Sequence, residues 1–361
     1  MIRPDMRATR RFLLQLPLAA AASAAAWITE ADPGNIKLVR RLPAEISDDD
    51  LLFLKQIGLR WARVEFPRER ARFDDLVAAQ KRYAAYGMKI HSVVHPAYRE
   101  IDLQLRRQPG CDRYIAEYQQ FLRDLGKLGM PVASYDFHPA NTYTTAIVES
   151  PRGYKTREFR LNDFREKVEK QKFDREYPVE EIWSNYEYFM KATLPVAAEA
   201  GVRMALHPDD PPLAMMNGVG KMFVHYDGYA RAERIAEAIE GKGAPHWGLT
   251  FCVGTWSEGG DRMGKNVFEM IEDFGGRGKL CEIHYRGVSS PLPNFTETFQ
   301  DEGYLDLYEV MKALRKVKFS GAVMPDHVPR LEGDSGINRA GTAYCIAWMR
   351  ATLARANAEV G

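Results

Sequence analysis

The sequence predicts an α/β fold: a (β/α)8 TIM barrel with a long insertion after the fourth strand. Short β-rich runs recur from Asn35 onward, segments with helical periodicity lie between them, and a glycine that would end a helix precedes several runs. Eight strands that alternate with helices are typical of a closed parallel barrel. An open doubly wound sheet is the alternative, but no glycine-rich phosphate turn follows the first strand.

Eight short apolar runs carry the strand prediction. In chain order they are NIKLVRRL (35–42), LRWARVEF (59–66), MKIHSVVH (88–95), PVASYDFH (131–138), VRMALH (202–207), WGLTFCVG (247–254), KLCEIHYRGV (279–288) and GAVMPDH (321–327). The segments between these runs are expected to form the outer helices.

Two of these segments show clear helix signals. In ISDDDLLFLKQIG, Ser47 is a plausible N-cap and Asp50 completes a capping box, while Leu51 and Leu54 share one face. The segment YLDLYEVMKALRKVKFSG (304–321) repeats this logic, and its basic residues gather at the C-terminal end, where they complement the helix dipole.

The spacing between the fourth and fifth strands is unusual. More than sixty residues separate SYDFHPA from VRMALH, and they include ESPRGYKTREFRLNDF (149–164), a basic and aromatic segment that we expect to be hairpin-like. A long excursion on the face where strands exit is a common place for a lid. A packing arm or a dimer arm is the alternative.

Composition excludes some classes of protein. The 361 residues contain 50 basic and 49 acidic side chains with no basic block, which argues against nucleic acid as a partner. The four cysteines, Cys111, Cys252, Cys281 and Cys345, are too scattered for a disulfide framework. The sequence leaves a homo-oligomer open.

Residues 1–30 resemble a cleavable export signal. Arg10 and Arg11 precede an apolar, alanine-rich stretch, as in the twin-arginine signals that carry folded cargo. Pro17 and the alanines make this stretch a poor membrane anchor, so no stable anchor is expected after cleavage. We expect residues 31–361 to form a single barrel domain that is periplasmic or exported; a cytoplasmic location is the alternative.

The expected site lies at the carboxyl ends of the strands, where TIM barrels place their chemistry. The last four strands each exit onto a side chain of a type that binds metals, and the set is His207, Cys252, His284 and Asp326. Thiolate and imidazole favour a first-row transition metal over magnesium or calcium. Widely spaced ligands that leave open positions are typical of a catalytic site. For each residue alone, a buried core cysteine or a hydrogen-bonded histidine is the alternative.

The motifs MALHPDDPP, GLTFCVG, EIHYRGV and MPDH resemble the successive signatures of the mannonate dehydratase family, within the xylose-isomerase-like barrels. The similarity runs from about residue 113 to the C-terminal helix. It implies a metal-dependent lyase that dehydrates D-mannonate to 2-keto-3-deoxy-D-gluconate with Mn(II) or Fe(II). It also implies that His207, Cys252, His284 and Asp326 are the metal ligands and that His327 is an acid/base residue.

Further roles follow from the chemistry of dehydration, in which a base removes the C2 proton and an acid assists the departing C3 hydroxyl. His327 could do one of these jobs, or it could be a structural histidine beside Asp326. Arg286 could pair with the substrate carboxylate, or it could neutralise a neighbouring aspartate. His138 and Asp209 are the other expected substrate-binding residues.

Departures from the family pattern leave other functions open. The family has a catalytic tyrosine shortly after the histidine; here VPRLEGDSGINRAGTAY has no tyrosine at that place, and Tyr344 lies in the expected helix. Tyr143 and Thr145 replace a tryptophan and an arginine of the family. The alternatives are a sugar isomerase or epimerase of the xylose-isomerase-like type, and a non-catalytic exported sugar-acid binder.

Overall fold

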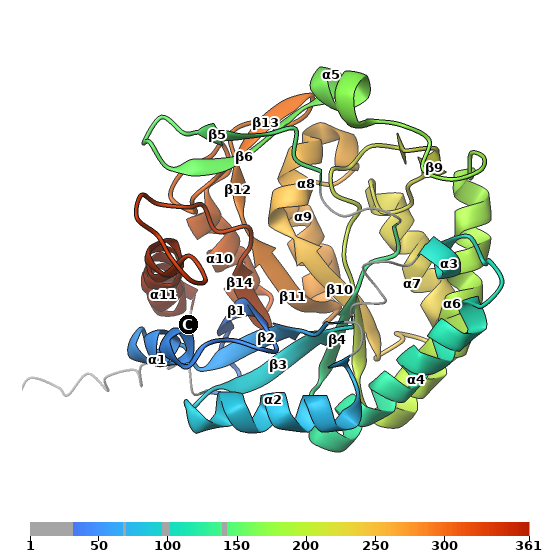
Figure 1. Cartoon of the computed structure of the whole chain (residues 1–361), viewed down its shortest axis with the longest axis horizontal. Coiled ribbons are helices and arrows are strands. Elements are labelled where there is room, and N and C mark those ends of the chain that lie inside the picture. The colour runs from blue at the N-terminus through green and yellow to red at the C-terminus, as the bar shows by residue number, and fades with distance from the viewer. Residues whose placement is uncertain (1–31, 68–69, 96–101, 139–142, 361) are drawn as a thin grey trace, which may run out of the picture.

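The computed structural model describes residues 32–67, 70–95, 102–138 and 143–360, and it contains the predicted barrel (Figure 1). All eight predicted strands form. They are β1 (Lys37–Pro43), β2 (Trp61–Glu65), β3 (Lys89–Val94), β4 (Val132–Tyr135), β7 (Arg203–Leu206), β10 (Trp247–Cys252), β11 (Leu280–Tyr285) and β14 (Ala322–Pro325). Each is parallel to both neighbours, and β1 pairs with both β2 and β14, so the sheet closes.

Helices surround the barrel and cover the apolar outer face of its strands (Figure 1). The longer ones are α1 (Asp48–Gln56), α2 (Phe73–Ala85), α4 (Cys111–Leu128), α6 (Val179–Ala200), α7 (Tyr226–Glu240), α8 (Val253–Gly259), α10 (Leu307–Lys316) and α11 (Arg339–Val360). Shorter helical segments are α3 (Asp102–Leu105), α5 (Leu161–Asp163), η3 (Phe164–Val168), η4 (Gly260–Met263), α9 (Val267–Met270) and η5 (Ile271–Gly275).

The two helices with clear sequence signals form as predicted. Ser47 caps α1 by accepting a hydrogen bond of 3.1 Å from the backbone N–H of Asp50. The Asp50 carboxylate accepts from the Ser47 hydroxyl at 2.7 Å and pairs with Arg339 of α11, so it links the first and last helices. Asp306 caps α10 by accepting from the N–H groups of the first turn.

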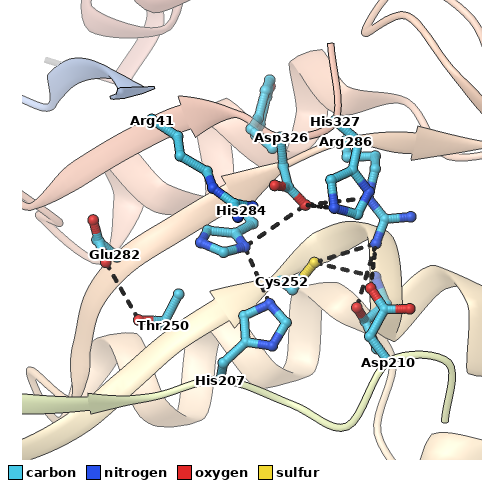
Figure 2. Close-up of polar contacts among 12 residues, drawn as sticks. Arg41, His207, Asp210, Thr250, Cys252, Glu282, His284, Arg286, Asp326 and His327 are labelled. Atoms are coloured by element: carbon cyan, nitrogen blue, oxygen red, sulfur yellow. Dashed lines mark hydrogen bonds and ion pairs between the residues drawn. The ribbon is translucent and has the colours of Figure 1, made fainter. Parts of the chain in front are cut away.

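The interior of the barrel contains a layer of buried polar side chains. Arg63 donates to Ser134 at 3.2 Å, and the hydroxyls of Ser134 and Thr250 lie 2.9 Å apart. Glu282 accepts from Thr250 (Figure 2) and from Ser92. Its Oε2 lies 3.5 Å from Nε of Arg63. Because burying a charge is costly unless it is paired, the buried charges of Arg63 and Glu282 lie together, and this network forms a polar layer beneath the carboxyl ends of the strands.

The insertion after β4 contains the predicted hairpin, β5 (Ala146–Glu149) and β6 (Lys155–Arg160). The hairpin is not isolated: β6 pairs with β13 (Asn294–Thr298), which follows the seventh barrel strand, in a four-stranded sheet completed by β12 (Gly287–Val288). A separate apolar cluster fills the space under this sheet; its buried members are Phe159, Phe164, Met216, Val288, Leu292 and Phe295. The insertion is therefore a fixed part of the strand-exit face.

A small hairpin, β8 (Met215–Met216) and β9 (Val219–Gly220), follows β7. None of the helices in the described parts of the chain is apolar and long enough to cross a bilayer. The leader predicted for residues 1–30 lies outside the described residues, and so does its junction with the barrel domain.

Candidate active site

A cavity of about 250 Å³ lies at the carboxyl ends of the barrel strands. Every side chain that lines it is ionisable: Arg41, Arg63, Asp136, His138, Arg157, His207, Asp210, His284, Asp326 and His327. Ligand pockets are usually lined mostly by apolar side chains with a few polar ones. A cavity of this composition instead suits a small, charged and highly hydroxylated molecule.

Three of the four predicted metal ligands converge beside this cavity. His207 follows β7, Cys252 ends β10, and His284 lies in β11. One ligand atom from each lies within 4.8 Å of the others, and Nε2 of His207 is 3.1 Å from Nδ1 of His284 (Figure 2). All three side chains are buried, so they form a cluster that could hold a metal ion.

Asp326, directly after β14, adjoins this group on its His284 side. Its Oδ2 lies 3.7 Å from Nδ1 of His284 and 3.3 Å from Nε of Arg286. Burial would raise the pKa of Asp326, but its neighbours His327, His284 and Arg286 outweigh burial and hold it well below its usual value. The structure therefore places a carboxylate next to the three clustered side chains.

The donor set fits a transition metal. Within the described residues, Nε2 of His284 and Oδ1 of Asp326 are buried without a hydrogen-bond partner. Burial raises the pKa of the Cys252 thiol to about 12 and, again through burial, lowers that of His284 well below its ordinary value. Buried polar atoms normally have partners, so the unpartnered Oδ1 of Asp326, beside a thiol and imidazoles, is an atom that a bound cation would satisfy.

A second group lies on the β4 side of the cavity. Oδ1 of Asp136 is 3.8 Å from Nδ1 of His207, and its Oδ2 is 4.0 Å from Nε2 of His138. Burial, and then the charge of Lys221, lowers the pKa of His138 to about 4, so its imidazole is neutral near pH 7. His138 thus lines the cavity as a neutral hydrogen-bonding group.

Arg286 does not line the cavity. Its guanidinium is fully buried and contacts four carboxylates and one thiol: Asp210 (2.9 Å), Glu258, Glu297 (3.3 Å), Asp326 (3.3 Å) and Cys252 (3.6 Å). Gly254 makes room for it, since a Cβ at Gly254 would lie 2.6 Å from Cζ of Arg286. Of the two roles that the sequence left open for Arg286, this geometry favours neutralising neighbouring acids.

The expectation that Asp209 binds substrate is not supported by its position. Asp209 is fully buried; its Oδ1 accepts from Nζ of Lys221 at 3.0 Å, and its Oδ2 accepts from the backbone N–H groups of Met222 and Phe223 at 3.1 and 2.8 Å. These bonds fasten the proline-rich corner to the segment before α7. The neighbouring carboxylate, Asp210, is the one that lines the cavity.

His327 has the geometry of a positioned acid/base group. Its Nδ1 lies 2.8 Å from Oε1 of Glu297, and its Nε2 lies 3.7 Å from Oδ2 of Asp326. Its backbone φ is +46°, a left-handed value that is rare for a residue with a side chain and recurs at functional sites. Glu297 comes from β13, so the sheet that contains the insertion also orients this histidine.

Sequence reasoning missed several residues that line or support the cavity. Arg41 and Arg63 lie in β1 and β2, and the strand-exit rule would have found them had it been applied to the early strands. Arg157 carries only a weak signal, its place in a basic hairpin. Glu297 carries none, because nothing in NFTET indicates that β13 packs over the site.

Tyr344 lies in a helix, as the sequence predicted, and it does not line the cavity. It is part of α11, its ring packs against Phe299 with centroids 4.9 Å apart, and its hydroxyl donates to Asp301. The cavity lining in the described part of the chain contains no tyrosine.

Comparisons with known proteins identify the family and support the barrel fold. The profile of the family described as D-mannonate dehydratase (UxuA) matches residues 141–356. Mannonate dehydratase of Streptococcus suis (strain 05ZYH33) is 26% identical over 335 residues, covering 85% of this chain and 85% of that protein.

Solved structures show the same fold. The crystal structure of mannonate dehydratase from Streptococcus suis serotype 2 superposes with a TM-score of 0.76 at 24% identity, covering 89% of this chain and 96% of that one. A xylose isomerase domain protein from Planctomyces limnophilus superposes with a TM-score of 0.56 at 10% identity, covering 88% and 96%. The chain, a homologue of a hydro-lyase, therefore belongs to the D-mannonate dehydratase (UxuA) family.

Proposed function

We propose that this protein is a metal-dependent hydro-lyase that dehydrates an aldonic acid, D-mannonate, to 2-keto-3-deoxy-D-gluconate. The observation that carries the proposal is the convergence of His207, Cys252 and His284 beside a cavity lined only by ionisable side chains. The names of the family and of its relatives point to the same substrate.

The metal would be Mn²⁺ or Fe²⁺, held by His207, Cys252, His284 and Asp326. A soft thiolate with two imidazoles and one carboxylate is a set that suits a first-row transition metal. When bound, such an ion stabilises negative charge that develops on substrate oxygens. Arg286 supports the set from behind, because its Nη2 contacts the Cys252 sulfur and its Nε contacts Asp326.

His327 would carry one of the two proton transfers. When its Nδ1–H donates to Glu297, Nε2 keeps the lone pair and becomes the atom that takes or returns a proton. The Glu297 carboxylate would then stabilise the imidazolium that forms. The partner for the second transfer would come from the other ionisable side chains of the cavity, and Asp136 and His138 are available on the β4 side.

The substrate carboxylate would bind at the arginines of the cavity, and we assign this role to Arg157 in place of Arg286. Arg157 lines the cavity, and its side chain has no ion-pair or hydrogen-bond partner among the described residues. The neutral imidazole of His138 would hydrogen-bond a sugar hydroxyl.

The test is an anaerobic assay of the metal-loaded protein with D-mannonate, in which the 2-keto acid is followed as its semicarbazone. We expect turnover that stops when a chelator is added, and His327→Gln should retain metal but lose most of the turnover. Interconversion of neutral sugars without keto acid would replace the proposal with an isomerase. Thermal stabilisation by D-mannonate without turnover would replace it with a sugar-acid binder.

For the leader we propose export by the twin-arginine route. The motif around Arg10 and Arg11 supports this, since that route carries folded, cofactor-loaded cargo. Replacing both arginines by lysine should retain the full-length chain inside the cell. An unchanged distribution between cell fractions would favour a cytoplasmic location.

A further inference from the structure

A second chamber opens beside the catalytic cavity. Its volume is about 670 Å³, against about 250 Å³ for the cavity, and the two share Arg41, Arg157 and His327 in their walls. One side of the chamber is built by β1 and another by the insertion strands β5 and β6. The segment between β14 and α11 and the last residue of β2 also line it. A six-carbon acid that occupies the cavity would leave this larger space unused.

The chamber has a strong positive charge. Five cations line it, Arg40, Arg41, Lys155, Arg157 and Arg330, and the single carboxylate among its lining residues is that of Glu65. Glu65 is already engaged, because its Oε1 lies 2.7 Å from Nε of Arg41 and 3.0 Å from Nη1 of Arg63.

Four of the five cations have no carboxylate partner within the described residues. Arg40 donates to the hydroxyl of Thr342 at 3.3 Å, and Arg330 donates to the backbone carbonyl of Asp334 at 3.3 Å. The side chains of Lys155 and Arg157 make no hydrogen bond or ion pair to any described residue. Elsewhere in this protein a cation close to the site is paired with acid, as Arg286 is with four carboxylates.

The backbone holds these cations in place. Lys155 and Arg330 form an isolated antiparallel bridge, with N–H to O distances of 3.0 Å in both directions. The hydroxyl of Thr156, between Lys155 and Arg157, donates to the backbone carbonyl of Glu297 at 2.9 Å. These main-chain contacts therefore keep Lys155 and Arg330 side by side on one wall of the chamber, where their like charges repel each other unless an anion binds between them.

We propose that this chamber binds a second anionic group of the substrate, so that the preferred substrate is an aldonic acid with a phosphate ester or a uronic acid at its far end. The inference rests on the proposed function for the catalytic cavity, which holds the reacting carboxylate end. Arg157 and His327 stand where the two spaces meet, and the distal anion is held by Lys155, Arg330 and Arg40. Phosphate and carboxylate share this chemistry, since both accept charge-assisted hydrogen bonds from arginine and lysine.

The experiment compares ligands that differ in the distal charge. Binding of D-gluconate and 6-phospho-D-gluconate is measured by calorimetry at low salt. Turnover is measured for D-mannonate, its 6-phosphate, a disaccharide aldonate with a neutral second sugar, and the same disaccharide with a uronic acid at that place. We expect the distal anion to improve affinity and kcat/KM by about tenfold or more, an advantage that falls as salt is added.

The variant Lys155→Gln/Arg330→Gln should lose this advantage while D-mannonate turnover stays the same, because neither residue lines the catalytic cavity. The matched control is Arg60→Gln/Lys242→Gln, which removes two exposed charges from loops that enter barrel strands. If the phosphate ester is preferred and the uronate is not, the distal anion is a phosphate; the reverse result identifies a uronic acid.

Equal binding of D-gluconate and 6-phospho-D-gluconate by the wild-type protein would overturn the chamber proposal, even if D-mannonate is dehydrated. A preference for the ligand with the distal anion that the double variant retains would overturn it as well. Tight binding of 6-phospho-D-gluconate that depends on Lys155 and Arg330, with no turnover of any acid, would instead overturn the proposed function and leave the anion site standing.

Discussion

Two arginines lie close to the catalytic cavity, and their surroundings are opposite. Arg286 is fully buried and contacts four carboxylates and the Cys252 thiol. Arg157 lines the cavity, and its side chain has no hydrogen-bond or ion-pair partner among the described residues. A buried arginine surrounded by acids stabilises the site, whereas an arginine that faces open space without a counter-charge is available to a ligand. This difference distinguishes an arginine that neutralises buried acids from one that can bind a ligand, and the position of an arginine along its strand does not tell the two apart.

The largest effect is expected when Arg286 is replaced by methionine. The substitution leaves Asp210, Glu258 and Glu297 buried without their shared cation, and breaking a buried ion pair from one side costs about 3–5 kcal/mol of the free energy of unfolding. Urea unfolding measures the loss, and Arg157→Met is the matched comparison. Similar losses in the two variants would remove the distinction between the two arginines.

Loss of metal is expected next. His207→Ala and Cys252→Ala should each lower the metal content after dialysis, because each removes one atom of the cluster. Cys281→Ala, which removes another buried thiol from a barrel strand, should retain the wild-type content. Elemental analysis of all three proteins measures the metal content. Full metal content in both cluster variants would show that neither His207 nor Cys252 is a metal ligand.

His327→Gln should reduce turnover by about 10²–10⁴-fold, the usual contribution of a general acid or base. Glu297→Gln should reduce it less, because the amide still accepts a hydrogen bond but cannot stabilise an imidazolium. The metal content should stay unchanged in both, and His246→Gln, at the opposite end of β10, is the control. Wild-type kcat in His327→Gln would assign that histidine a structural role.

Metal uptake should release protons. Burial raises the pKa of Cys252 to about 12, so at neutral pH the metal-free thiol is protonated, while the lowered pKa of His284 leaves its imidazole neutral. Binding therefore displaces the thiol proton, and the apparent affinity for metal should rise about tenfold per pH unit for each proton released. An indicator dye in weak buffer counts the protons. Cys252→Ala should release one fewer, and an equal count would mean that sulfur does not bind the ion.

The smallest effect on stability is expected for Arg157→Gln. Substitutions away from packed or paired groups usually change the free energy of unfolding by less than about 0.5 kcal/mol. The KM for D-mannonate should nevertheless rise by about tenfold or more, because a charge-assisted hydrogen bond to the carboxylate is lost. Steady-state kinetics measures the KM and urea unfolding measures the stability of the same sample. An unchanged KM would assign the carboxylate-binding role to the other cavity arginines.

Much of the architecture was predictable from the residues. Strand boundaries could be read because buried parallel strands are short apolar runs, and glycines mark the helix ends before several of them. The composition of the insertion predicted its hairpin, but nothing in the sequence predicted that β6 pairs with β13. The convergence of His207, Cys252 and His284 followed from one rule of barrel geometry: the carboxyl ends of parallel strands meet on one face.

The roles of the charged residues were harder to predict, because they depend on which side chains meet. The pairing of Asn294 with Arg160 joins strands more than 130 residues apart, and it brings Glu297 to His327 and Arg157 to the cavity. Asp209 and Asp210 are neighbours in the chain, yet one fastens a loop and the other lines the site. In this proline-rich corner, two consecutive carboxylates therefore have different surroundings: Asp209 contacts the segment before α7, and Asp210 lines the cavity.

The sequence by itself determined the barrel, the strand exits and the residue types that gather there, because periodicity and parallel-strand geometry are local properties. Only the tertiary structure decided that Arg286 is surrounded by carboxylates and that the side chain of Arg157 faces the cavity without a counter-charge. Electrostatic pairing depends on distances between atoms that lie far apart in the chain, and those distances exist only once the barrel has closed and the insertion sheet has packed on it.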